Sequence, residues 1–206
     1  IIALLSLLRT NHVVRQVDLA NPRLFSTQED TTKHAARVLE LNTTLVSLDM
    51  GKCAVSDEGL GLLCDAMTRN PTLRQLSLPC NKVGSVGAER LATLLCQPNC
   101  ALTAVSLSAN EVGDEGARAF AYALRNCASL EALDLRSNGI GDAGLVALAR
   151  AMAENNSVRE LRLWGNTFGR QASIEFDQLL KNRFKYLEVR VDLVTYDVDG
   201  VTYVAQ

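Results

Sequence analysis

The chain repeats one pattern of apolar and polar positions. Each unit has Leu or another apolar residue at positions 1, 4 and 6, a polar residue at position 9 and an apolar residue at position 11. One such unit is Leu130, Leu133, Leu135, Asn138 and Ile140. The units begin at residues 14, 45, 73, 102, 130 and 158, which are 28 to 31 residues apart. A period of this length indicates a solenoid of stacked repeats.

Each unit predicts one short strand followed by one helix. Apolar and polar residues alternate over positions 3 to 7, which is typical of a strand. After position 11, apolar residues recur at helical spacing, as in Ala88, Leu91 and Leu95. Turns rich in Gly, Ser and Asp join the two halves and suit helix N-caps. A single unit cannot bury its leucines, so we expect an α/β solenoid, bent into a horseshoe arc, with a parallel inner sheet and outer helices.

Two sets of asparagines accompany the units. The amide at position 9 both donates and accepts, so it can satisfy backbone groups where the chain leaves the strand. Cys53 and Pro22 take this position in two units, where a thiol substitutes weakly and proline not at all. A second set stands three residues before most units. Because Asn tolerates a left-handed backbone, we expect it to end each helix and turn the chain. Its members are Asn11, Asn42, Asn70, Asn99 and Asn155.

The pattern divides the chain into three parts. Residues 1–13 read as the outer helix that ends a truncated upstream repeat, and residues 14–186 hold six repeats. In residues 187–206 the pattern stops, and the alternation around Asp199-Gly200 predicts a β-hairpin. We expect this hairpin, or an added strand from the same segment, to cover the open end of the sheet, where unpaired strand edges invite aggregation.

These units resemble leucine-rich repeats, and their length resembles that of the ribonuclease-inhibitor subfamily. The resemblance covers residues 14–186. Two further stretches, LRLWGNTFG (161–169) and DVDGVTYVAQ (197–206), are similar to the C-terminal part of one intracellular member. That similarity implies an interaction protein with no catalytic site to carry over.

Composition and charge limit the classes of partner and ligand that we expect. The net charge of −2 gives no basic field for phosphates, so we expect no nucleic-acid partner. The apolar run at the N-terminus is too short to span a bilayer, so we expect no membrane partner. The 6 cysteines form no CxxC pair and have no flanking histidines, which predicts no metal and no cofactor.

The cysteines also bear on location. We interpret them as reduced thiols of an intracellular, most simply cytoplasmic, protein, and a nuclear or cytoskeleton-associated location stays open. A disulfide framework stays open by count. An extracellular receptor fragment also stays open, because Asn42-Thr43-Thr44 and Asn155-Asn156-Ser157 are N-glycosylation sequons.

Function is expected on the concave face of the sheet. No nucleophile–base pair, phosphate loop or metal cluster is visible in the sequence, so we expect neither an enzyme nor a small-molecule substrate. Positions 3, 5 and 7 of each unit point away from the leucines. Most of them are small in the early units and large and charged in the last two. The candidate partner-binding residues are Asp49, Ser77, Ser106, Asp134, Arg136, Glu160, Arg162 and Trp164.

Trp164 is the single tryptophan. Strand spacing brings Arg136 next to Trp164 and Asp134 next to Arg162. We interpret Trp164 as an aromatic anchor beside arginines, the residue types that dominate binding hot spots. Two alternatives stay open: Arg136 stacks on the indole, or the C-terminal hairpin folds across it.

The predicted function is therefore a protein-interaction scaffold that binds a partner protein on its concave face. The alternative is a regulator of a small GTPase, because an activating protein of that kind resembles the same repeat subfamily. Its basis is the likeness of fold alone.

Overall fold

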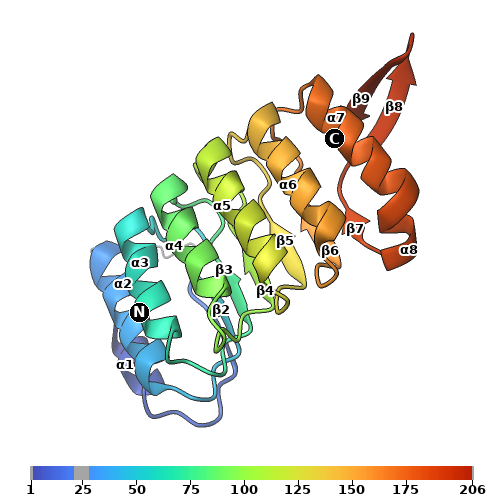
Figure 1. Ribbon diagram of the computed structural model, residues 1–206. Coiled ribbons are helices and arrows are strands. Elements are labelled where there is room, and N and C mark those ends of the chain that lie inside the picture. Colours follow the sequence, from blue (N-terminus) through green and yellow to red (C-terminus); the bar gives the residue numbers. More distant parts are fainter. Residues whose placement is uncertain (1, 21–27, 206) are drawn as a thin grey trace.

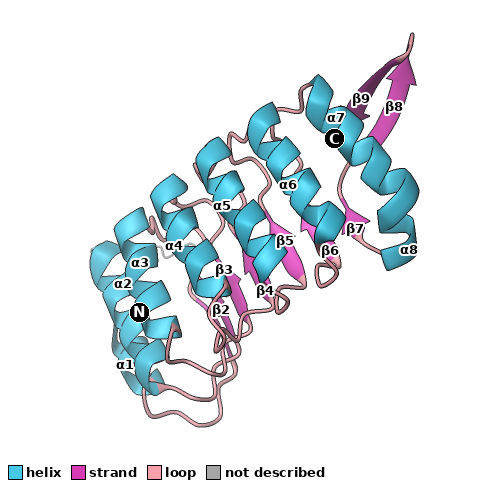
Figure 2. Cartoon of the chain, in the orientation of Figure 1, coloured by secondary structure: helices cyan, strands magenta, loops and turns pink. Residues whose placement is uncertain are grey.

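The computed structural model describes residues 2–20 and 28–205. Strands and helices alternate along the chain and stack into an arc (Figures 1 and 2). The strands line the inner side of the arc and the helices cover the outer side. The predicted leucine-rich-repeat solenoid is confirmed.

The strands of the repeats form one parallel sheet in chain order. Each has only two or three residues, because the chain must turn back to the outer helix within one repeat. In the described part of the chain this sheet comprises β1 (Gln16–Asp18), β2 (Ser47–Asp49), β3 (Gln75–Ser77), β4 (Ala104–Ser106), β5 (Ala132–Asp134), β6 (Glu160–Arg162) and β7 (Arg190–Val191).

The outer layer consists of one helix per repeat. The last repeat helix continues into a π-helical turn, Leu180–Phe184, and a short helix α8 (Lys185–Leu187). The repeat helices are α1 (Ile2–Leu8), α2 (Gln28–Leu41), α3 (Asp57–Met67), α4 (Ser85–Leu95), α5 (Gly113–Asn126), α6 (Asp142–Glu154) and α7 (Arg170–Leu179).

The core is a continuous layer of aliphatic side chains between the sheet and the helices. The strand register sets Val105 beside Leu133 and Leu133 beside Leu161. Each of these three side chains is at most 3% exposed. A fully buried leucine contributes about 1.5–3 kcal/mol, so stacking alone stabilises each repeat considerably.

The asparagines at position 9 form the predicted ladder. The amide of Asn138 donates to the carbonyls of Leu107 and Arg136, each at 2.9 Å, while its Oδ1 accepts from the N–H of Val112 at 3.3 Å. In the Cys53 unit the thiol lies 3.4 Å from the carbonyl of Leu19, a weaker substitute. The expectation for Pro22 lies outside the described residues. Asn81, Asn110 and Asn166 make equivalent amide bonds.

The second set of asparagines works differently from the expectation. None of them has a left-handed backbone among the described residues, and Asn155 is extended, with φ −72 and ψ 137. The amide of Asn70 donates to the carbonyl of Leu39 at 2.7 Å, and its Oδ1 accepts from the N–H of Leu73 at 2.8 Å. Because the side chain satisfies these groups, no left-handed turn is needed here. The prediction is wrong on this point.

Left-handed residues occur instead at position 8, just before the ladder asparagine. Ala109 and Ser137 have φ values of 55 and 51, and Gly165 has 78. An added Cβ on Gly165 would lie 2.4 Å from the hydroxyl of Ser137. Glycine at this position therefore serves both the turn and the close packing of neighbouring loops.

The C-terminal hairpin forms as predicted, from β8 (Val194–Val198) and β9 (Val201–Ala205). Its turn uses positive φ values of 51 at Asp199 and 79 at Gly200, which suit a tight hairpin. However, the hairpin is a separate sheet. An added strand from the tail covers the open edge as expected, because β7 pairs with β6 there; the hairpin itself does not cover it. The division into 1–13, 14–186 and 187–206 stays a prediction.

The hairpin is attached to α7 rather than to the sheet. The hydroxyl of Thr195 donates to Asp177 at 2.7 Å, and Val204 packs against the core. The opposite face of the hairpin carries Val194, Tyr196, Val198 and Tyr203, which are 44–66% exposed.

Candidate functional site

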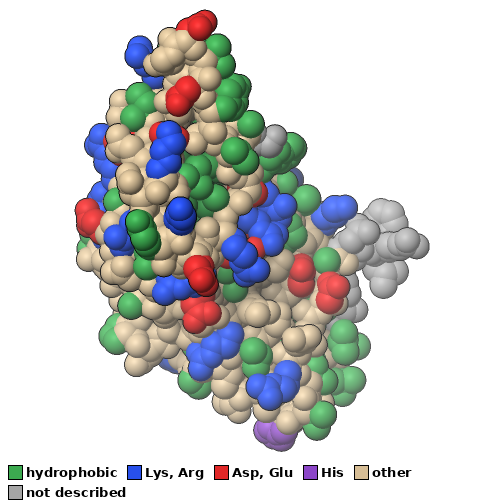
Figure 3. Space-filling view, turned by 90° about the vertical axis from the view of Figure 1, so that its right-hand side faces the viewer, with side chains coloured by type: hydrophobic (Ala, Val, Ile, Leu, Met, Phe, Trp, Pro, Cys, Tyr) green, Lys and Arg blue, Asp and Glu red, His purple; other side chains and the backbone are tan. Residues whose placement is uncertain are grey.

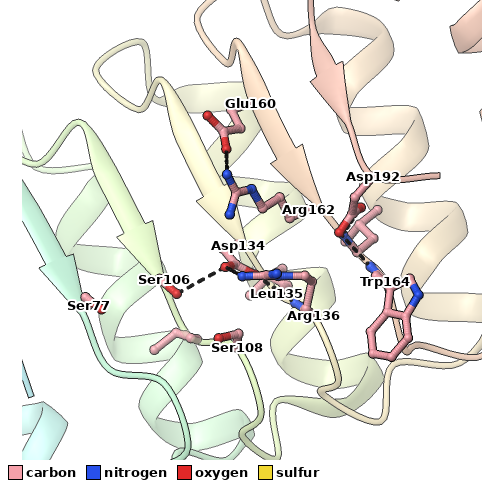
Figure 4. Close-up of polar contacts among 12 residues, drawn as sticks. Ser77, Ser106, Ser108, Asp134, Leu135, Arg136, Glu160, Arg162, Trp164 and Asp192 are labelled. Carbon is pink, nitrogen blue, oxygen red and sulfur yellow. Dashed lines mark hydrogen bonds and ion pairs between the residues drawn. The ribbon is translucent and has the colours of Figure 1, made fainter. Parts of the chain in front are cut away.

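The concave face presents the alternate residues of each strand. Leu133, Leu135, Leu161 and Leu163 are at most 1% exposed, so the residues between them point away from the core. Figure 3 shows the side of the molecule that carries this face, with basic and acidic side chains interleaved over its middle. Figure 4 shows the arrangement over β4 to β7.

Arg136 is held by a carboxylate on its own strand. Its Nε and Nη2 donate to the two oxygens of Asp134 at 2.9 and 2.6 Å. The hydroxyl of Ser106 reaches the same carboxylate at 3.3 Å. The hydrogen bonds that Arg136 donates to Asp134 raise the pKa of Arg136, and the two-pronged contact fixes the orientation of the charged guanidinium.

Glu160 holds two arginines. Its carboxylate pairs with Arg162 on the same strand and accepts from Nη2 of Arg190 on β7 at 2.9 Å. The side chain of Glu160 is 21% exposed, whereas those of Arg162 and Arg190 are 46% and 79% exposed. The carboxylate of Glu160 therefore lies close to the sheet, and the guanidinium groups of Arg162 and Arg190 extend into solvent.

Trp164 stands on the open face at the end of β6. It is 50% exposed, although Leu161 and Leu163, with which it alternates, are buried. The carboxylate of Asp192 accepts from the backbone N–H of Leu163 at 2.7 Å and from that of Trp164 at 3.1 Å (Figure 4). The backbone that carries the indole is therefore fixed, while the ring remains accessible.

The two alternatives for Trp164 find little support in this geometry. The guanidinium of Arg136 is bonded to Asp134 rather than stacked on the indole. The ring pairs found in the described chain are Phe168 with Phe176 and Tyr196 with Tyr203. The hairpin is bonded to α7 through Thr195, and half of the Trp164 surface stays exposed, so the hairpin does not fold across the whole ring.

The structure separates the candidate residues into two groups. Ser106, Asp134, Arg136, Glu160, Arg162 and Trp164 lie together over β4 to β6, in what we call the arginine–tryptophan cluster. Asp49 and Ser77 lie on β2 and β3, where the hydroxyl of Ser77 donates to Asp49 at 2.8 Å. The carboxylate of Asp49 also accepts from the N–H of Gly51, so this pair stabilises the strand ends.

Sequence reasoning missed Arg190 and Asp192. Both belong to β7 and its continuation, which the repeat template did not include. The signal was present: Val189, Val191 and Leu193 alternate with the two polar residues, as in a strand with one buried face.

Potential metal-binding groups and membrane-spanning helices are absent from the described residues. Among the described residues, no group of three or more His, Cys, Asp or Glu side chains could hold a metal ion. No helix in the described ranges is long and apolar enough to cross a bilayer.

Comparison with known families identifies the repeats. The model of the family described as Leucine Rich repeat matches residues 41–64, 69–92, 99–121 and 126–149. The chain is a leucine-rich-repeat protein. Its assignment to the ribonuclease-inhibitor subfamily stays a prediction.

Individual relatives agree with this class. The chain is 36% identical over 92 residues to mouse leucine-rich repeat-containing protein 34, a match that covers 45% of this chain and 22% of that protein. It is 41% identical over 69 residues to the human protein of the same name, covering 34% of this chain and 15% of that one. The chain thus spans about a fifth of the length of the curated relatives it matches.

Among solved structures, the tropomodulin C-terminal domain from Caenorhabditis elegans has a similar fold. Its TM-score is 0.58 at 16% identity, and the match covers 74% of this chain and 91% of that one. At this identity the likeness concerns the fold alone.

Proposed function

We propose that the chain is a protein-binding scaffold module that binds a partner protein on its concave face, centred on the arginine–tryptophan cluster. The observation that carries the proposal is the 50% exposure of Trp164 on a backbone fixed by Asp192. Large aromatic residues and arginines carry most of the binding energy in protein interfaces. Because the backbone of Trp164 is already fixed, only the two side-chain torsions of the indole lose entropy when a partner covers it.

The arginines around Trp164 support the same proposal. Each is bonded to a carboxylate of the chain, Arg136 to Asp134 and both Arg162 and Arg190 to Glu160. These bonds restrict the orientation of the arginines before binding, and with Asp192 counted three carboxylates stand against the three arginines. A partner with mixed polar and apolar groups therefore fits this surface better than a highly charged one.

Affinity capture with matched variants tests the proposal. Wild-type protein, Trp164→Ala and Tyr122→Ala are immobilised, exposed to the same cell extract, and the bound proteins are quantified by mass spectrometry. Tyr122 is the matched control, because it is an aromatic residue on the outer helix α5 with 65% exposure. Proteins retained by wild type and Tyr122→Ala but lost by Trp164→Ala are the partners that the proposal expects.

The proposal fails if Trp164→Ala retains the same proteins as wild type. Loss with both variants would equally contradict it, because binding would then depend on exposed aromatics in general. Circular dichroism of the three proteins confirms that each is folded.

A regulator of a small GTPase remains the alternative, with no observation in its favour beyond the fold. GTP hydrolysis by candidate GTPases, with and without this protein, measures it directly. We also propose an intracellular location, supported by the six free cysteines.

A further inference from the structure

A second polar surface lies at the opposite end of the sheet from Trp164. The loops that lead into β1, β2 and β3 border a groove of about 410 Å³, which we call the edge groove. Its walls include His12, Arg15, Thr43, Val46, Thr72 and Arg74.

Backbone hydrogen bonds fix the spacing of the two arginines. The N–H of Val46 donates to the carbonyl of Arg15 at 2.7 Å, and the N–H of Arg74 donates to the carbonyl of Val46 at 2.8 Å. The three residues therefore stand side by side on adjacent strands. Two strand spacings separate the Cα atoms of Arg15 and Arg74 by about 9–10 Å.

No carboxylate of the described residues pairs with these two arginines, whereas carboxylates pair with arginines elsewhere on the sheet. No residue that borders the edge groove is acidic. Among the described residues, the side chain of Arg15 has no hydrogen-bond or ion-pair partner, and that of Arg74 donates only to the carbonyl of Ala101, at 2.8 Å. By contrast, Arg136 and Arg162 are each paired with a carboxylate.

The surface view agrees with this contrast. Towards the bottom of Figure 3, at the end of the molecule that holds the first repeats, basic side chains and a histidine lie among neutral and hydrophobic ones. Uncompensated guanidinium groups at fixed spacing favour an anionic ligand, because each one can form a two-pronged hydrogen bond with a carboxylate.

We propose that the edge groove binds an acidic, extended polypeptide segment. Residues i and i+2 of such a segment point to the same side and lie about 6.6 Å apart. The Cα atoms of Arg15 and Arg74 lie farther apart than this, but their long side chains can converge on two acidic side chains at this spacing. The exposed hydroxyl of Thr43 is a further donor. This site goes beyond the proposed function, because it lies away from the arginine–tryptophan cluster and takes a ligand of defined charge.

Fluorescence anisotropy with labelled peptides tests the proposal. The probes are octaglutamate and, as a neutral control, octaglutamine. We expect wild type to bind octaglutamate only, and the affinity to fall as salt screens the charges. Arg15→Gln with Arg74→Gln weakens binding at least about tenfold, whereas Arg118→Gln changes it less than about twofold. Arg118 is the matched control, because it is an exposed arginine on the outer helix α5.

Three results would overturn the proposal: equal binding of the two peptides, unchanged affinity in the double variant, or an equal loss with Arg118→Gln. The last would indicate attraction by overall charge rather than by the groove. Circular dichroism verifies that the double variant is folded. Trp164→Ala binds octaglutamate like wild type, so this site and the concave-face site succeed or fail separately.

Discussion

Replacing Asn138 by alanine tests the asparagine ladder. Asn138 is 1% exposed, and its side chain bonds the carbonyls of Leu107 and Arg136 and the N–H of Val112. In the variant, the carbonyl of Leu107 keeps its bond from the Asn110 amide at 2.9 Å. The carbonyl of Arg136 also keeps a backbone bond, from Ala109, at 2.8 Å. The N–H of Val112 loses its side-chain acceptor.

The expected loss of stability follows from the backbone groups that lose a hydrogen bond. A buried N–H without a partner costs about 1–3 kcal/mol, and Val112 is 0% exposed. The two weakened carbonyls add about 1 kcal/mol in total. We therefore expect Asn138→Ala to lower the free energy of unfolding by about 2–4 kcal/mol.

Urea unfolding followed by circular dichroism measures this loss. The matched control is Asn126→Ala, because the exposed amide of Asn126 bonds only the carbonyl of Tyr122. We expect that variant to stay within about 0.5 kcal/mol of wild type. Equal unfolding midpoints for the two variants would refute the role assigned to the ladder.

The other predictions concern side-chain environments. Trp164 fluorescence should be red-shifted and quenched by acrylamide, and Trp164→Ala should keep stability within about 1 kcal/mol; blue-shifted, unquenched emission would contradict this. Burial raises the pKa of Cys64 to about 12, so iodoacetamide should alkylate exposed Cys80 first; equal rates would refute it. A hydrogen bond from Lys181 lowers the pKa of Asp177. Ionised Asp177 therefore contributes fully to the stability of the fold above the ordinary aspartate pKa of about 3.9. This contribution is lost as pH falls through the lowered pKa of Asp177 in the folded protein. NMR shifts of the C-terminal hairpin should report this loss, and Asp177→Asn should abolish it.

The sequence was sufficient for the repeat architecture. Leucines at fixed positions determine which face of each strand is buried, so the register of β4, β5 and β6 follows from the template. The position-9 asparagines were predictable for a related reason, since a side chain with both donor and acceptor is needed where the chain leaves the strand. The exposed position of Trp164 followed from the same alternation.

Other features depended on side-chain conformation or on weaker patterns. Cross-strand spacing predicted Asp134 beside Arg162, and the strand register does place them opposite each other. Arg162 nevertheless pairs with Glu160, because a long side chain can also reach the carboxylate two residues away on its own strand. The position of β7 was missed because Glu188 is charged where the repeat template has an apolar residue at position 1, although Val191 and Leu193 fit positions 4 and 6.

The affinity of a captured partner for wild type, Trp164→Ala and Tyr122→Ala tests the central claim most directly. Isothermal titration calorimetry provides the three dissociation constants. A hot-spot residue costs at least about 2 kcal/mol on truncation, so we expect Trp164→Ala to weaken binding roughly 30-fold and Tyr122→Ala to leave it unchanged. Equal affinities for Trp164→Ala and wild type would contradict a binding site centred on this residue.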